Sequence, residues 1–235
     1  MKRKQNDAIV DFSIVFSIPR FLVTKFVVFA CMALATILFR QKTIGRHNLS
    51  KFKDTGCLIA SNHSLYLDPM IITRATSTRR IFYSAMRNTF DVPFLGIFIR
   101  LLGAFPISGR IGLNQIITPV KKLLNQGRFV LFFPEGFLEH PGWELQEFKS
   151  GVFFLACQLN VPVVPLVIIS KPRRKAGFWE SQFVSRVKVV IGKPLYPDMG
   201  NTAGASGQPD RDAIKELSDR TWKAMNEILK KEYGG

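Results

Sequence analysis

A histidine and an aspartate five positions apart, His63 and Asp68, are of the right type and spacing to act as a proton-transfer pair. The apolar run 57–60 before them predicts a buried strand, so that His63 enters the turn that follows. Asp68 and Pro69 predict the start of the next helix, with Asp68 as its N-cap. The turn is long enough for the carboxylate to reach one imidazole nitrogen, which leaves the other nitrogen to accept a proton from a hydroxyl. The alternative is that Asp68 only caps the helix while His63 satisfies a buried turn.

A second candidate is the polar turn formed by Pro134, Glu135 and Gly136. The run 128–133 in front of it, which is apolar after Arg128, predicts a strand. Such a turn exposes backbone N–H groups and a carboxylate at the edge of an α/β sheet, where ligands of open sheets bind. Taken alone, these residues also fit an ordinary turn. The sequence has no Gly-x-Ser-x-Gly motif, so the attacking hydroxyl is expected to belong to the substrate.

Together, the two motifs resemble those of the glycerolipid acyltransferase family typified by the 1-acylglycerol-3-phosphate (lysophosphatidic acid) acyltransferases. Asn62, His63 and Asp68 meet the Asn-His-x4-Asp motif of that family. The resemblance extends over residues 45–195. Further family blocks are matched by residues 45–49, 134–136, 148–151 and 161–165.

The resemblance implies that His63 is the general base and Asp68 its partner. It also implies that Asn62, Glu135 and Gly136 belong to the substrate-binding residues. The donor would be an acyl thioester, carried by coenzyme A or acyl carrier protein, and neither a metal nor another cofactor would be needed. The acceptor would be a lysophospholipid, 1-acyl-sn-glycerol-3-phosphate above all, and the product phosphatidic acid.

Two departures from the family pattern concern the acceptor. The family commonly continues Pro-Glu-Gly with Thr-Arg-Ser, whereas this chain has 137–139 as Phe-Leu-Glu. The phosphate-binding arginine of the family also stands one residue earlier than Arg110, the candidate here, and Lys149 is a second candidate cation. Three alternatives therefore stay open: a different lyso-lipid acceptor, glycerol-3-phosphate, or a catalytically silent lipid-binding protein.

The composition favours a membrane surface as the partner. The chain has 33 Lys and Arg against 17 Asp and Glu, a net charge of +16, and 47% hydrophobic residues. Positive charge attracts nucleic acid or an anionic membrane. The apolar content and the lack of a zinc-finger or RNA-recognition signature favour the membrane, so no nucleic-acid partner is expected. Three widely spaced cysteines in apolar runs predict buried thiols.

Residues 1–44 are predicted to anchor the chain in the membrane. Two apolar stretches, 8–18 and 21–39, are separated by Pro19, and basic residues flank both ends. The second stretch is close to the roughly 20 residues that cross a bilayer. Basic residues at both ends favour a two-helix, monotopic anchor at the cytoplasmic face of the inner or plasma membrane over a single-pass helix.

Residues 45–235 are predicted to form one α/β catalytic domain, in which helices flank a central, mostly parallel or mixed sheet. The prediction rests on the alternation of β-rich and helical runs. Beyond the helix at Asp68, strands are expected at 57–60, 81–85, 104–107, 128–133, 161–169 and 184–191, and helices at 93–102, 112–126, 148–159 and 210–232.

Overall fold

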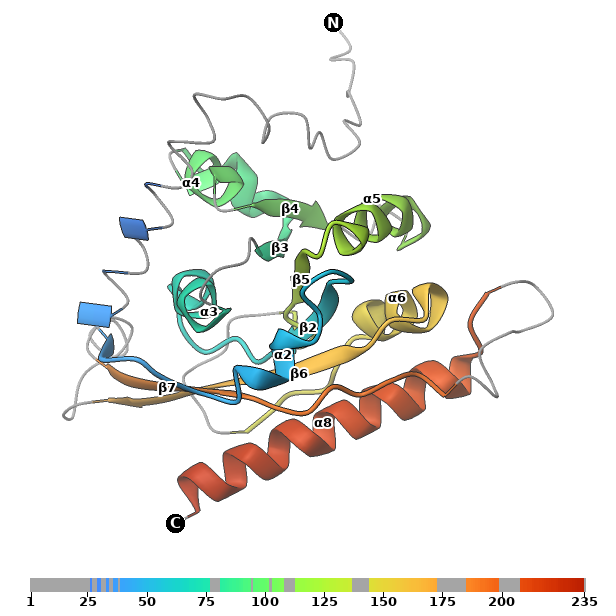
Figure 1. Ribbon diagram of the computed structural model, residues 1–235. Helices are drawn as coiled ribbons and strands as arrows, with labels where there is room; N and C mark the ends of the chain where they lie inside the picture. Colours follow the sequence, from blue (N-terminus) through green and yellow to red (C-terminus); the bar gives the residue numbers. More distant parts are fainter. Residues whose placement is uncertain are drawn as a thin grey trace, which may run out of the picture.

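A mixed seven-stranded sheet forms the centre of the described part of the chain (Figure 1). The strand order is β1-β7-β6-β2-β5-β3-β4. The computed structural model describes single residues between 26 and 39 and the ranges 40–76, 81–93, 95–101, 103–107, 113–136, 144–172, 185–198 and 208–234.

Strands and helices alternate along most of the described chain. The strands are β1 (Lys42–Ile44), β2 (Cys57–Ser61), β3 (Ile81–Met86), β4 (Ala104–Ile107), β5 (Phe129–Phe132), β6 (Val163–Pro172) and β7 (Ser185–Ile191). The helices are α2 (His47–Ser50), α3 (Asp68–Thr76), the 3-10 helix η2 (Arg87–Asp91), α4 (Leu95–Leu101), α5 (Leu113–Asn125), α6 (Gly151–Leu159) and α8 (Arg211–Tyr233). Strands β2 to β6 run parallel, whereas β7 is antiparallel to β6 and pairs in parallel with β1.

Helices cover both faces of the sheet, so the domain has three layers. On one face, Cys57 and Ile59 of β2 pack in a core with α3. On the other face, Leu58 and Ala60 pack in a core with α5, α6 and Leu217 of α8. Every residue of β2 is therefore buried, which explains why its sequence is uninterruptedly apolar up to Ser61. Figure 1 shows α8 running along the sheet beside β6.

The sheet order brings the two sequence motifs to one edge. Strand β2 lies between β5 and β6 and runs parallel to both. The carboxyl ends of parallel strands meet at the same edge of a sheet. The turn after β2, which carries His63, therefore lies beside the turn after β5, which carries Glu135.

The structure confirms the predicted class, an α/β domain with a mixed sheet between helices. The short helices α2 and η2 were not predicted, and two further differences concern the candidate site and the predicted anchor. Helix α6 begins at Gly151 rather than at residue 148, because the backbone N–H of Lys149 is bonded to the carbonyl of Pro134. Strand β1 was not predicted, since three residues are too few for a recognisable pattern. It pairs with β7, so the sheet includes residues 42–44, which were assigned to the predicted anchor.

Most of the predicted membrane anchor lies outside the described residues. Among the residues that are described, no helix combines the length and the apolar character needed to cross a membrane. The two-helix anchor over residues 1–44 stays a prediction.

Candidate active site

His63 and Asp68 are directly hydrogen-bonded. The imidazole Nδ1 of His63 lies 2.8 Å from Oδ2 of Asp68. The aspartate side chain is fully buried, whereas the histidine side chain is 23% exposed. With Nδ1 directed at a carboxylate, Nε2 is the ring nitrogen that is left to accept a proton. The pair therefore has the arrangement that general-base chemistry requires.

The Asp68 carboxylate faces the turn that precedes it rather than the helix that follows it. Its Oδ2 also accepts hydrogen bonds from the backbone N–H groups of Ser64, at 2.7 Å, and Leu65, at 3.0 Å. Asp68 is the first residue of α3, but among the described residues no helical N–H donates to its carboxylate. The predicted N-cap bond is therefore replaced by bonds that fold the turn around His63, and the reading of Asp68 as only a helix cap does not hold.

Glu135 holds the backbone of His63 from the neighbouring turn. Its Oε1 accepts a hydrogen bond from the backbone N–H of His63, at 3.2 Å. Its Oε2 accepts one from the backbone N–H of Gln146, also at 3.2 Å. The predicted catalytic pair and the predicted Pro-Glu-Gly turn are thus one connected site.

An aromatic ring supports the imidazole of His63. Phe133, the residue after β5, stacks on it with ring centroids 4.2 Å apart and an interplanar angle of 20°. Phe133 fixes one face of the ring and Asp68 fixes its Nδ1 edge. No role was predicted for Phe133, because its contact with His63 depends on β5 lying beside β2.

Asn62 joins the end of β2 to β6. Its side-chain Nδ2 donates to the carbonyl of Ile168, at 2.9 Å, and its Oδ1 accepts from the N–H of the same residue, at 2.8 Å. The side chain is buried and takes the place of a backbone pairing. This geometry holds the strand end from which His63 projects. Substrate contact by Asn62 stays a prediction.

Gly136 and Lys149 lie against each other at the turn after β5. Gly136 has a φ of +80°, a conformation that favours glycine. A methyl group at this position would stand 2.3 Å from Nζ of Lys149, so the lysine side chain lies over the turn. Lys149 is exposed and its backbone N–H bonds to Pro134 at 2.9 Å. The structure thus brings one predicted cation to the predicted acceptor turn.

Several predicted features fall outside the described residues. They include Arg110, the 137–139 stretch and Cys31. Cys57 and Cys157 are free and buried, as their apolar surroundings predicted. In the described part of the chain, no three His, Cys, Asp or Glu side chains come together as a metal site would require.

The His63–Asp68 pair thus lies at the carboxyl edge of an α/β sheet, beside the turn after β5. The acyltransferase family model matches residues 41–169, and the chain belongs to this family. It is 30% identical over 158 residues to a chloroplastic 1-acyl-sn-glycerol-3-phosphate acyltransferase of Brassica napus, over 65% of this chain and 44% of the relative. It is 28% identical over 206 residues to a 1-acyl-sn-glycerol-3-phosphate acyltransferase of Bacillus subtilis, over 86% of this chain and 94% of the relative.

The fold is also that of a solved structure. The crystal structure of the 1-acyl-sn-glycerophosphate acyltransferase PlsC from Thermotoga maritima superposes with a TM-score of 0.62 at 20% identity, over 92% of this chain and 86% of the other. This likeness shows the fold. The chain spans about half the length of the first curated relatives that it matches, 44% and 48%.

Proposed function

We propose that this protein transfers a fatty acyl group from an acyl thioester to the free hydroxyl of 1-acyl-sn-glycerol-3-phosphate, which gives phosphatidic acid. The observation that carries the proposal is the 2.8 Å hydrogen bond between His63 and the buried Asp68. Membership of the acyltransferase family supports the reaction type. The relatives' names, 1-acyl-sn-glycerol-3-phosphate acyltransferase, support the acceptor.

In this proposal His63 is the general base. Its Nε2 takes the proton of the acceptor hydroxyl while the hydroxyl oxygen attacks the thioester carbonyl carbon. Asp68 stabilises the imidazolium that forms. The C–S bond then breaks, and the departing thiolate of coenzyme A or acyl carrier protein takes the proton from His63. The acyl group passes directly to the acceptor without a metal or further cofactor, and a trapped acyl-protein on the reaction path would contradict this step.

The acceptor headgroup is proposed to bind at the turn after β5. Glu135 and Gly136 form this turn beside His63, and the Lys149 side chain lies over it. A lysine ammonium is suited to a phosphate group because its hydrogen bonds to the phosphate oxygens are charge-assisted. Arg110 is the second proposed phosphate ligand, on sequence grounds alone.

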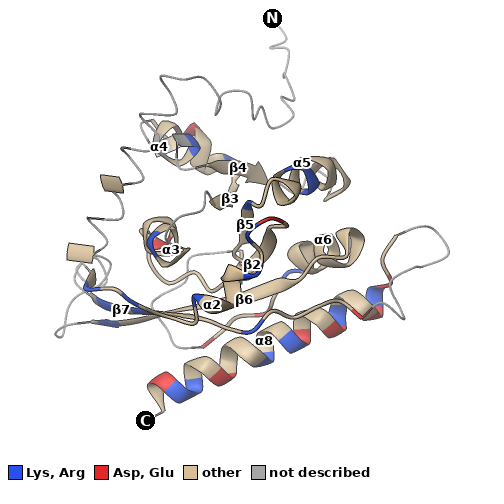
Figure 2. Ribbon diagram, in the orientation of Figure 1, with Lys and Arg blue, Asp and Glu red and all other residues tan. Residues whose placement is uncertain are grey.

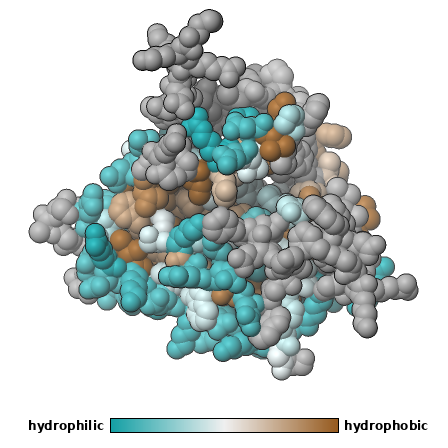
Figure 3. Space-filling model, turned by 180° about the vertical axis from the view of Figure 1, so that it is seen from behind, coloured by the Kyte–Doolittle hydropathy of each residue, from teal (hydrophilic) through white to brown (hydrophobic). Residues whose placement is uncertain are grey.

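The reaction is proposed to take place at the cytoplasmic face of the inner or plasma membrane, with the anchor in the residues before β1 and the catalytic domain from β1 to residue 235. Exposed hydrophobic side chains in the range 86–101 support the proposal that this part of the surface faces lipid. They are Met86, Val92 and Ile97. Two arginines against one aspartate in the same range add a positive charge that an anionic bilayer attracts. Figure 3 shows hydrophobic atoms at the upper right, the side on which α4 lies.

The test is acyl transfer by the detergent-purified full chain. Labelled acyl-coenzyme A and acyl carrier protein thioesters are each combined with 1-acyl-sn-glycerol-3-phosphate, glycerol-3-phosphate and a lyso-lipid without phosphate. We expect transfer to the first acceptor. His63→Ala should lower the rate at least about a hundredfold, the contribution of a general base. His47→Ala, at an exposed histidine on α2, is the matched control and should keep the wild-type rate.

Three outcomes would change the proposal. Transfer to another acceptor keeps His63 as the base and replaces the substrate. If His63→Ala transfers the acyl group at the wild-type rate, His63 is not the base and the proposed mechanism is wrong. Lipid binding without transfer to any acceptor identifies a silent lipid-binding member of the family.

A further inference from the structure

The segment 144–150, which lies between β5 and α6, connects the last helix to the candidate active site. It forms neither helix nor strand, so its backbone groups must find partners elsewhere. The N–H of Lys149 bonds to the carbonyl of Pro134 in the turn after β5. The side chain of Leu145 is buried with Met225 and Leu229 of α8. One part of the segment is thus held by α8 and another by the site.

Gln146, in the middle of this segment, bonds in both directions through its backbone. Its carbonyl accepts a hydrogen bond from the indole Nε1–H of Trp222 on α8, at 3.2 Å. Its N–H donates to Oε2 of Glu135, whose Oε1 accepts the N–H of His63. Three hydrogen bonds therefore lead from the indole of α8 to the backbone of the proposed base.

We propose that Trp222 is a positioning residue for His63 and acts through Gln146 and Glu135. The inference rests on the proposed function of His63. The bond from Gln146 fixes Oε2 of Glu135, while Oε1 accepts the N–H of His63. Without the indole, Gln146 loses the partner of its carbonyl and the 144–150 segment is held less firmly. Glu135 then gains freedom to rotate away from the N–H of His63.

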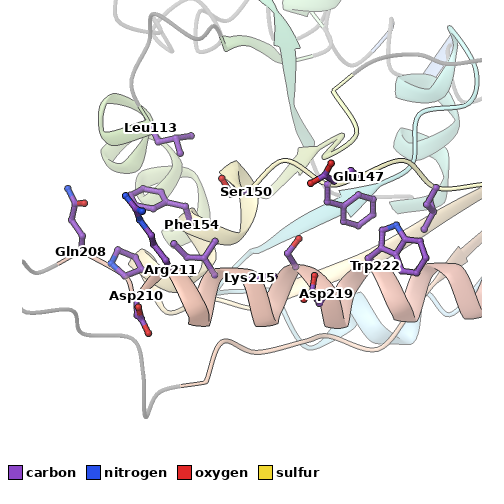
Figure 4. Close-up of a pocket in the computed structure, with 15 residues that line it drawn as sticks. Leu113, Glu147, Ser150, Phe154, Gln208, Asp210, Arg211, Lys215, Asp219 and Trp222 are labelled. Atoms are coloured by element: carbon purple, nitrogen blue, oxygen red, sulfur yellow. The ribbon is translucent and has the colours of Figure 1, made fainter.

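Trp222 packs at the edge of the small core that includes Leu145 and Met225, so a substitution that keeps a ring there is needed to isolate its hydrogen bond. The indole is partly exposed and lines a groove of ≈ 1140 Å³ between α8 and the 144–150 segment. Figure 4 shows Trp222 rising from α8 toward the part of the chain that carries Glu147. Because the ring is not enclosed on all sides, Trp222→Phe keeps an aromatic ring there and removes the N–H donor. Ser218, one turn earlier on α8, lines the same groove and serves for the matched control Ser218→Ala.

The first readout does not depend on activity. The chain contains three histidines, so selective ¹⁵N-histidine labelling gives three backbone amide signals, and that of His63 is the one that disappears in His63→Gln. We expect Trp222→Phe to move the His63 signal and Ser218→Ala to leave it in place. The movement should vanish when Glu135→Gln is already present, because an amide group cannot accept both N–H bonds. A His63 signal that stays in place in Trp222→Phe overturns the proposal.

The second readout is kinetic, with whichever donor and acceptor the wild type uses. Trp222→Phe should lower kcat about three- to tenfold, the effect of one hydrogen bond, and leave KM for both substrates unchanged. The double variant with Glu135→Gln should be no slower than Glu135→Gln alone, since both changes break one chain of bonds. If the double variant instead shows the product of the two single reductions in kcat, the two residues act independently and the proposal is contradicted. An inactive wild type would count against the proposed function, while the amide signal still decides the role of Trp222.

Discussion

At the scale of single residues, the candidate site depends on how one buried carboxylate is used. Oδ2 of Asp68 is shared by the imidazole of His63 and by two backbone N–H groups of the turn. One residue therefore orients the base and shapes the loop that carries it. A neutral amide of the same size is a sharp probe of this double role, because it keeps the volume and removes the charge.

Asp68→Asn should lower the rate of acyl transfer about a hundredfold or more. An asparagine no longer stabilises the imidazolium, and its NH₂ group cannot accept the bonds that the turn donates. The measurement is the initial rate together with the thermal midpoint of unfolding. Asp54→Asn, at an exposed aspartate just before β2, is the control and should match the wild type in both. A rate near that of the wild type would show that the pair is not catalytic.

At the scale of elements, the turn after β5 depends on a backbone conformation that glycine provides. Gly136→Ala should reduce stability by about 1 kcal/mol or more, since alanine is strained at a φ of +80° and its methyl group displaces Lys149. Acyl transfer should fall as well, because Glu135 precedes this position. Gly151→Ala is the matched control. Its methyl group would meet only Leu113, at 3.4 Å, and thermal unfolding should show little change.

The local part of this site could be predicted from sequence, and the long-range part could not. The approach of Asp68 to His63 requires only a five-residue turn between a strand and a helix. The bond from Glu135 to His63 requires β5 to lie next to β2, and no local pattern encodes the order of strands in a sheet. The contacts of Phe133, Gln146 and Trp222 at this site also join segments that are distant in the sequence. The bonds between Asn62 and Ile168 are long-range in the same way, since the two residues are 106 positions apart.

At the scale of the whole molecule, charged residues and buried residues lie in different regions. Figure 2 shows basic and acidic residues mixed along α8, whereas the strands of the sheet are largely without charge. The thiols belong to the uncharged interior. Burial raises the pKa of Cys57, and burial together with Glu216 raises the pKa of Cys157 to about 11. Their reactivity therefore reports on the integrity of the folded domain.

Both thiols should resist alkylation at pH 8 until the domain unfolds, because they are inaccessible and protonated. The measurement is the mass increase with a thiol reagent in a Cys31→Ser background, with and without denaturant. The raised pKa values of the two thiols also make the stability of the folded domain depend on pH. The unfolded thiols ionise near pH 9, so the free energy of unfolding should decrease as the pH rises from about 9 toward 11. Rapid labelling of the native protein would contradict the buried placement of the two residues.

At position 146 the connection from α8 to the candidate active site passes through the backbone of one residue rather than through its side chain. Gln146 contributes its N–H and its carbonyl, which nearly every amino acid carries at the same place. These two bonds therefore require no particular side chain at position 146, except that proline has no N–H to donate. Relatives can preserve the arrangement while their residues at position 146 drift. The proposed connection therefore constrains the side chains of Glu135 and Trp222, while its link at position 146 is visible only in three dimensions.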